Sequence, residues 1–229
     1  NVKASLDGDF KIAVLTVVPW LTQFTVQPAS LVGGNPVQGR IVLAQPAVAG
    51  GVDVQLATND AVHVLLPNPP TINVPAGVQT LTFPINTGGV TVNTAVNTTA
   101  TLLGVSITAN FNLLPAQLSS LTFNPPSVSN GSKSVATVSL DGKAGADTNV
   151  AIAYVSGLTG ATFPASVTIP AQSSSVDFDV IPPFTPIDTS LTLSATLNAV
   201  VKQGTLNVLA TDIVSIDLSS NNVLGGSVV

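Results

Sequence analysis

Alternating apolar and polar residues run through most of the chain, with turn residues between the alternating segments. Between residues 37 and 44, Gly39, Ile41 and Leu43 fall on one face of an extended chain, and Arg40 and Val42 fall on the other. A period of two is that of a β-strand. The same alternation predicts inward-facing residues in two later segments, which are Leu81, Phe83 and Ile85, and Val176, Phe178 and Val180. Asp177 and Asp179, between the last three, are expected to point to water.

Gly and Pro separate these segments at short intervals, which predicts many short strands. The strands expected in the first half of the chain are Leu21–Gln27, Val37–Ala44, Val52–Thr58, Val62–Leu66, Thr71–Val74, Val78–Ile85, Val96–Leu103 and Val105–Leu114. Val and Thr, which suit pleated and half-buried surfaces, are abundant in them. Strands of this length, with a turn about every 8–12 residues, are typical of a two-sheet antiparallel sandwich.

The chain also repeats itself. Leu21–Leu43 aligns without gaps with Leu118–Leu140 at a spacing of 97 residues, and Val74–Ile85 aligns with Ile169–Val180 at a spacing of 95. Two complete repeats are therefore expected, over residues 19–115 and 116–210. Residues 1–18 match the closing strands of a repeat and residues 211–229 match the first strands of one. We interpret the ends as parts of a preceding and a following repeat.

The residues that the repeats share carry a resemblance to a known family. They include a Pro and a Gly after the first strand (Pro28 and Gly34, Pro125 and Gly131), the Pro-Ala of "VPAG" (74–77) and "IPAQ" (169–172), and the segment "ATL". This pattern resembles the bacterial immunoglobulin-like tandem repeats of large surface and secreted proteins. The resemblance implies an all-β fold of tandem immunoglobulin-like antiparallel β-sandwiches, located extracellularly or at the cell surface.

Charged residues are scarce, and this limits the classes of partner that are expected. They make up 7% of the chain against 45% hydrophobic residues, and the formal net charge is −5. An ordinary soluble domain has roughly 25% charged residues. Without a basic patch, nucleic acid is not an expected partner. Apolar stretches such as Ile12–Leu15 are far too short to span a bilayer, so no membrane insertion is expected in this segment.

Side chains with catalytic chemistry are few, and the sequence predicts no enzyme. The chain has no Cys and no Glu, and its single His, His63, follows Asp60 by three residues. A Ser-His-Asp triad could be built around such a pair. However, Val62 and Val64 alternate around His63 as in a strand, which favours a structural or surface His. We therefore expect no catalytic residue and no cofactor.

One acidic loop is a candidate for metal binding. Calcium prefers carboxylate and backbone oxygens, and Asp141 and Asp147 bracket a Gly-containing loop. Because Asp and Gly are also ordinary turn residues, and because no acidic cluster recurs in both repeats, the expectation is that no metal is bound. Asp141 and Asp147 remain the calcium candidates.

The repeats share core positions and no functional residues, which favours a structural function. The expected function is a structural or adhesive extracellular protein, in which a semi-rigid tandem array forms or projects as a surface fibre or filament. Its expected partners are copies of itself in a filament or layer, with a surface glycan or protein at the tip. The alternative is a carbohydrate- or protein-binding accessory module of a larger secreted protein. Trp20 would then be a ligand platform and not a packing residue between repeats.

Overall fold

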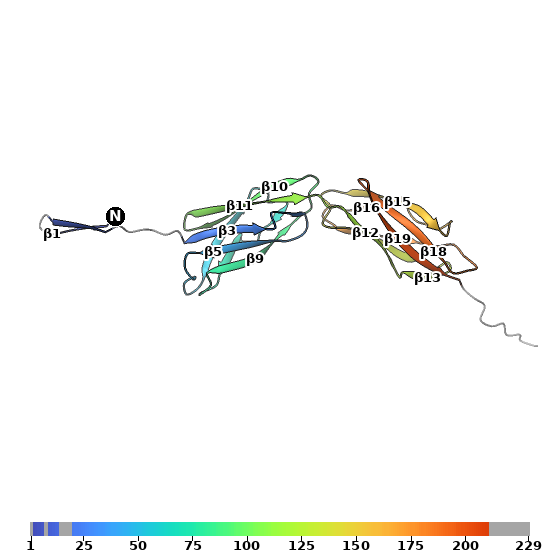
Figure 1. Ribbon diagram of the computed structural model, residues 1–229, viewed down its shortest axis with the longest axis horizontal. Helices are drawn as coiled ribbons and strands as arrows, with labels where there is room; N and C mark the ends of the chain where they lie inside the picture. The colour runs from blue at the N-terminus through green and yellow to red at the C-terminus, as the bar shows by residue number, and fades with distance from the viewer. Residues whose placement is uncertain (1, 7–8, 14–19, 211–229) are drawn as a thin grey trace, which may run out of the picture. The chain divides into compact units, whose positions relative to one another are not determined.

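The computed structural model describes residues 2–6, 9–13 and 20–210, with side chains from residue 20 onward. All regular elements in these ranges are strands (Figure 1). None of the described residues forms a helix long and apolar enough to cross a membrane. The expected partial repeats at 1–18 and 211–229 lie largely outside the described residues. Within the first of them, β1 (Val2–Leu6) pairs antiparallel with β2 (Asp9–Ala13), so that Leu6 lies opposite Asp9.

The first sandwich consists of two sheets. One has the order β3-β5-β9-β7, and the other has the order β4-β11-β10-β6-β8. The strands of the first sheet are β3 (Leu21–Gln27), β5 (Val37–Leu43), β9 (Thr80–Thr87) and β7 (Val64–Leu65). Those of the second are β4 (Ser30–Val32), β11 (Val105–Leu114), β10 (Thr94–Leu102), β6 (Val52–Thr58) and β8 (Thr71–Val74).

The second sandwich repeats this plan. Its sheets have the orders β12-β14-β17 and β13-β19-β18-β15-β16. The strands of the first sheet are β12 (Leu118–Asn124), β14 (Ser134–Leu140) and β17 (Ser175–Val180). Those of the second are β13 (Ser127–Ser129), β19 (Val200–Leu209), β18 (Thr189–Leu197), β15 (Thr148–Gly157) and β16 (Ser166–Ile169).

Strand order confirms the expected all-β sandwich class and its immunoglobulin-like topology. In chain order the first, second and fifth main strands (β3, β5, β9) share one sheet, and the third, sixth and seventh (β6, β10, β11) share the other. This is the Greek-key arrangement of immunoglobulin domains. Most neighbouring strands are antiparallel, as in the pairs β3–β5, β10–β11 and β18–β19. In contrast, β4 runs parallel to β11, and β13 runs parallel to β19.

The burial of β5 shows why the alternation predicted these strands well. Val37, Gly39, Ile41 and Leu43 are buried, and Gln38 and Arg40 are exposed. The strands predicted at Leu21–Gln27, Val52–Thr58, Thr71–Val74 and Val105–Leu114 have the observed bounds. The expected inward faces of β9 and β17 are confirmed at four of the six positions, since Phe83, Ile85, Phe178 and Val180 are buried. The other two, Leu81 and Val176, are half-buried.

The chain divides into two compact units. Unit 1 contains residues 1–117 together with residues 140–149 and 168–174, and unit 2 contains residues 118–139, 150–167 and 175–229. In unit 1 the core lies between the two sheets of the first sandwich, with Phe24, Ile41, Val54 and Leu113 among its members.

Candidate functional site

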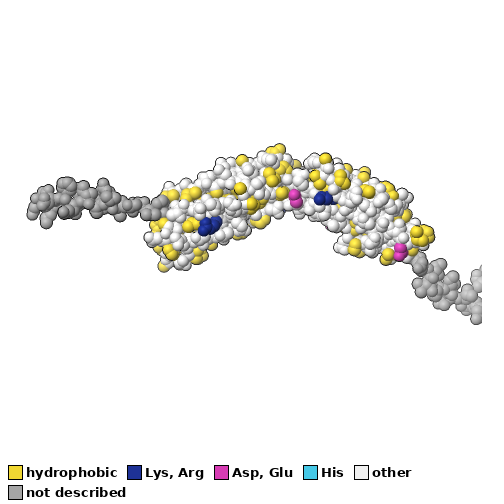
Figure 2. Space-filling view, viewed as in Figure 1, with side chains coloured by type: hydrophobic (Ala, Val, Ile, Leu, Met, Phe, Trp, Pro, Cys, Tyr) yellow, Lys and Arg dark blue, Asp and Glu magenta, His cyan; other side chains and the backbone are white. Residues whose placement is uncertain are grey.

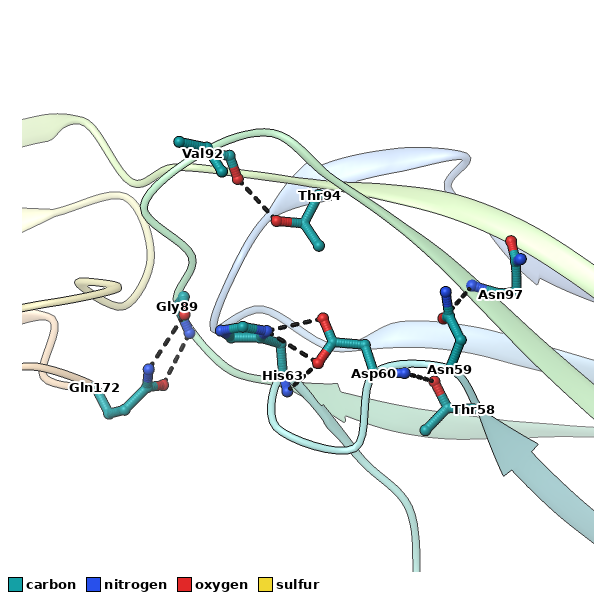
Figure 3. A network of polar contacts seen from close by, with 9 residues as sticks. All are labelled: Thr58, Asn59, Asp60, His63, Gly89, Val92, Thr94, Asn97 and Gln172. Atoms are coloured by element: carbon teal, nitrogen blue, oxygen red, sulfur yellow. Dashed lines mark hydrogen bonds and ion pairs between the residues drawn. The ribbon is translucent and has the colours of Figure 1, made fainter.

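Asp60 and His63 form a polar pair joined by several contacts in the first sandwich (Figure 3). The Nδ1 atom of His63 lies 2.8 Å from Oδ2 and 3.0 Å from Oδ1 of Asp60. The backbone N–H of His63 also donates to Asp60 Oδ1 at 3.0 Å, and the N–H of Asp60 donates to Thr58 Oγ1 at 3.1 Å. The carboxylate is thus held against both the ring and the backbone of His63.

The expected strand Val62–Leu66 is wrong over its first two residues. Residues 61–63 form a turn, and β7 begins only at Val64. The turn closes because the N–H of Val64 donates to the carbonyl of Asp60 at 3.0 Å, and Asp60 bonds the N–H of His63 in the same turn. An Asp side chain that bonds the backbone two or three residues on competes with strand pairing, and here it wins.

This geometry fits a structural role for His63. An Asp that orients a His supplies two members of a triad, and the third would be a hydroxyl or thiol on the other ring nitrogen. No hydroxyl group in residues 20–210 makes a hydrogen bond to His63. The corresponding stretch of the second repeat, residues 153–176, contains neither Asp nor His.

Because of this pair, the stability of unit 1 at acid pH depends on the protonation of Asp60. Burial raises the pKa of Asp60, but the hydrogen bonds from the His63 side chain and backbone outweigh it, and the pKa falls below its ordinary value of 3.8. A depressed carboxyl pKa adds stability that is present above the unfolded-state pKa and is lost as the pH falls through the folded-state pKa.

We therefore expect Asp60→Asn to destabilise unit 1 at pH 7 by about 1 kcal/mol and to have a much smaller effect at pH 2. Urea unfolding followed by the fluorescence of Trp20, the single Trp, would measure both values. Asp53→Asn is the control, because Asp53 is an exposed carboxylate on β6 of the same sandwich whose side-chain hydrogen bond, from Asn73 Nδ2 at 2.7 Å, is also exposed. An equal loss at both pH values would contradict the expectation.

Each of the two calcium candidates, Asp141 and Asp147, accepts a hydrogen bond from a different backbone amide. Asp141 Oδ1 accepts from the N–H of Gln117 at 2.7 Å, and Asp147 Oδ1 accepts from the N–H of Ala171 at 2.8 Å. No group of three or more His, Cys, Asp or Glu side chains suited to a metal occurs among the described residues. Each carboxylate thus accepts a hydrogen bond from a backbone amide of another segment of the chain.

Trp20 borders an apolar pocket on the first sandwich. The cavity has a volume of about 330 Å³ and is lined by Trp20, Val48, Gly51, Val52, Asp53, Leu102 and Leu103. We call it the head pocket. Leu103 has a positive φ of 48° in the two-residue turn between β10 and β11, and its side chain is 77% exposed. The turn thus holds a Leu at the rim of the pocket.

Sequence reasoning missed a second apolar feature, on unit 2. Residues 182–188, which we call the tail loop, join β17 to β18 and expose Phe184 by 79% and Ile187 by 69%. The signal was present in the sequence: two large apolar residues stand in a Pro-rich connection, where the alternation of strands does not apply, and Phe184 aligns with Gly89 of the first repeat.

The tail loop is held firmly by polar contacts. Asn130 Nδ2 donates to the carbonyl of Thr185 at 2.6 Å, and the N–H of Thr185 donates to Asn130 Oδ1 at 3.0 Å. The hydroxyl of Thr185, which is buried, donates to the carbonyl of Ile187 at 2.9 Å. At the end of the loop, Asp188 Oδ1 accepts from the N–H of Ala210 at 2.8 Å. These bonds fix the backbone from which Phe184 and Ile187 project.

Comparisons with known proteins give structural likeness only. The chain matches no protein-family model, and no curated protein matches its sequence. Among solved structures it is similar to invasin, a bacterial integrin-binding protein, at 15% identity and a TM-score of 0.46 over 83% of this chain and 39% of that one. It is also similar to the BSP domain of a biofilm-associated protein, at 14% identity and a TM-score of 0.29 over 86% of this chain and 30% of that one. Domains 1–6 of the surface layer protein SbsC match at 13% identity and a TM-score of 0.33, over 86% and 29% of the two chains. The chain spans less than two fifths of the length of each of these proteins.

Proposed function

We propose that this chain is a structural or adhesive extracellular protein, whose tandem sandwiches form or project as a semi-rigid surface fibre. The observation that carries the proposal is the contrast between core and polar side chains across the repeats. Buried positions recur, as in Phe83 and Phe178, whereas Asp60 and His63 have no counterpart. A chain that bound or converted the same ligand in each repeat would repeat the polar groups as well.

The surface composition supports the same function. Lys, Arg and Asp side chains are sparse on the face shown in Figure 2, where most of the surface belongs to uncharged polar side chains and backbone, with scattered apolar side chains. Thr side chains pair across exposed strands, as in Thr99 with Thr108 at 2.8 Å and Thr192 with Thr205 at 3.0 Å. A low density of charge lowers the repulsion between molecules and favours lateral or axial packing.

An accessory sugar-binding module is less well supported. Such a module would present aromatic faces to the ligand. Trp20 is half-buried in the wall of the head pocket, and the hydroxyl of Tyr154 donates to the carbonyl of Gly157 at 2.8 Å. The two residues also lie in different units.

Immunogold electron microscopy of native cells and of their medium tests the proposal. An antibody raised against the 229-residue chain is expected to label filaments or a layer outside the cell. Label confined to the cell interior, or a native protein that stays strictly monodisperse and monomeric at high concentration, would contradict it. Preimmune serum on the same sections is the control.

A further inference from the structure

Asn130, which holds the tail loop, lies in the tight turn between β13 and β14. The N–H of Ser132 donates to the carbonyl of Ser129 at 3.0 Å and closes this turn, so that Asn130 and Gly131 occupy its two central positions. Gly131 has a positive φ of 72°, a backbone conformation that residues with a side chain rarely adopt. The turn therefore favours Gly directly after Asn130.

The ring of Phe184 gives a second reason for Gly at this position. A Cβ on Gly131 would lie 3.3 Å from Cζ of Phe184, which is tighter than an ordinary van der Waals contact. In the first repeat, Gly33 and Gly34 stand at the positions of Asn130 and Gly131. The sequence thus contains a single Asn-Gly pair, and it lies where the structure of unit 2 favours keeping the Gly.

The side chain of Asn130 suits its contacts because an amide both donates and accepts hydrogen bonds. Its Nδ2 donates to the carbonyl of Thr185 at 2.6 Å, and its Oδ1 accepts from the N–H of the same residue at 3.0 Å. We call these two bonds the amide latch. A carboxylate only accepts, and in place of Nδ2 it would set an oxygen against the carbonyl of Thr185. An ionised Asp at position 130 therefore cannot form the first of the two bonds.

Asn followed by Gly is chemically labile, because Gly has no side chain to hinder attack by its own backbone nitrogen on the Asn side chain. In this reaction the nitrogen of Gly131 bonds to Cγ of Asn130, and the Cγ–Nδ2 bond breaks. Nδ2 leaves as ammonia, taking up the proton of the Gly131 N–H. Water then opens the cyclic imide and gives Asp or isoaspartate. Each such event adds one negative charge to a chain whose formal net charge is −5.

We propose that Asn130 is a site of deamidation, that the amide latch slows this reaction in the folded chain, and that the reaction releases the tail loop irreversibly. The side chain must leave Thr185 before Cγ reaches the nitrogen of Gly131, so the reaction proceeds from the open state of the latch. The acid product cannot re-form the Nδ2 bond, and Phe184 and Ile187 then lose the fixed backbone from which they project. This modification goes beyond the proposed fibre function and does not depend on it.

Peptide mapping by mass spectrometry, on the 229-residue chain kept in mildly alkaline buffer, tests the site and its protection. Asp and isoaspartate are expected to accumulate at position 130 faster than at any other Asn when the chain is unfolded in urea. In native buffer the rate at position 130 is expected to be roughly 30-fold lower, which corresponds to the net strength of two hydrogen bonds. This comparison needs no variant, so it does not depend on how a substitution affects folding.

Thr185→Pro and its matched control Thr185→Val distinguish the latch from general protection by folding. Both variants lack the hydroxyl that donates to the carbonyl of Ile187, but only Pro lacks the N–H that donates to Asn130 Oδ1. Pro186 already favours extended backbone at position 185, where Pro is tolerated. In native buffer Thr185→Pro is expected to deamidate roughly fivefold faster than Thr185→Val, and in urea the two rates should be equal. Thermal unfolding midpoints would show that both variants are folded.

Hydrogen exchange of the Asn130→Asp variant measures the consequence for the tail loop. The N–H of Thr185 is expected to exchange roughly fivefold faster than in the unmodified chain, because the latch has lost its Nδ2 bond. The N–H of Ile152, which donates to the carbonyl of Ala165 at 2.9 Å elsewhere in unit 2, is the control and should not change. Equal deamidation rates in native buffer and urea, equal rates for the two Thr185 variants, or unchanged exchange at Thr185 would overturn the inference.

Discussion

Replacing Leu193 with Ala is expected to lower the free energy of unfolding of unit 2 by about 2–5 kcal/mol. Leu193 lies in the middle of β18, where it pairs with Tyr154 of β15 and Gly204 of β19, and its side chain is fully buried. The loss combines the transfer free energy of the removed carbons with the cavity they leave, because neighbours fixed in a sheet collapse only partly.

Urea unfolding followed by far-ultraviolet circular dichroism would measure this loss, since unit 2 contains no Trp. Val201→Ala on β19 is the control: Val201 is exposed in the same sheet, and its replacement should change the free energy of unfolding by no more than about 0.5 kcal/mol. A loss for Leu193→Ala as small as that of the control would mean that the core of unit 2 does not depend on this side chain.

Replacing Thr98 with Val is expected to stabilise unit 1, by about 1–3 kcal/mol. Thr98 occupies in β10 the position that Leu193 occupies in β18, at a spacing of 95, and it is fully buried. Its hydroxyl has no hydrogen-bond partner among the described residues. A buried hydroxyl without a partner costs its desolvation free energy, and Val keeps the β-branched shape without the polar atom.

Thermal or urea unfolding followed by Trp20 emission would measure the gain in unit 1. Thr99→Val is the matched control, because the hydroxyl of Thr99 is exposed and bonds Thr108 at 2.8 Å, so that its removal should not stabilise. If Thr98→Val were neutral or destabilising, the hydroxyl would have a partner that offsets its burial. The pair of positions shows how one sandwich plan accommodates a polar and an apolar residue at the same core site.

Local pattern was sufficient for most of the fold. The alternation around Ile41 predicted both β5 and its buried face, because neighbouring side chains of a strand must point to opposite sides whatever the strand pairs with. The repeat alignment carried the same prediction to β14 and β17. The alternation failed where a side chain formed a local turn. Val62 and Val64 alternate as in a strand, but the Asp60 carboxylate accepts a hydrogen bond from the backbone of His63 and residues 61–63 form a turn.

The candidate surfaces required the tertiary structure. That Thr98 is buried without a partner depends on what the opposite sheet places above it, and that Phe184 is exposed depends on Asn130 holding the tail loop from 55 residues away along the chain. The head pocket likewise gathers Trp20, Val52 and Leu103 from three separate stretches of sequence. The sequence by itself determined the strands, their inward faces and the repeat, because these follow from neighbours along the chain. Only the tertiary structure decided which apolar residues were left uncovered, because burial depends on contacts between residues far apart.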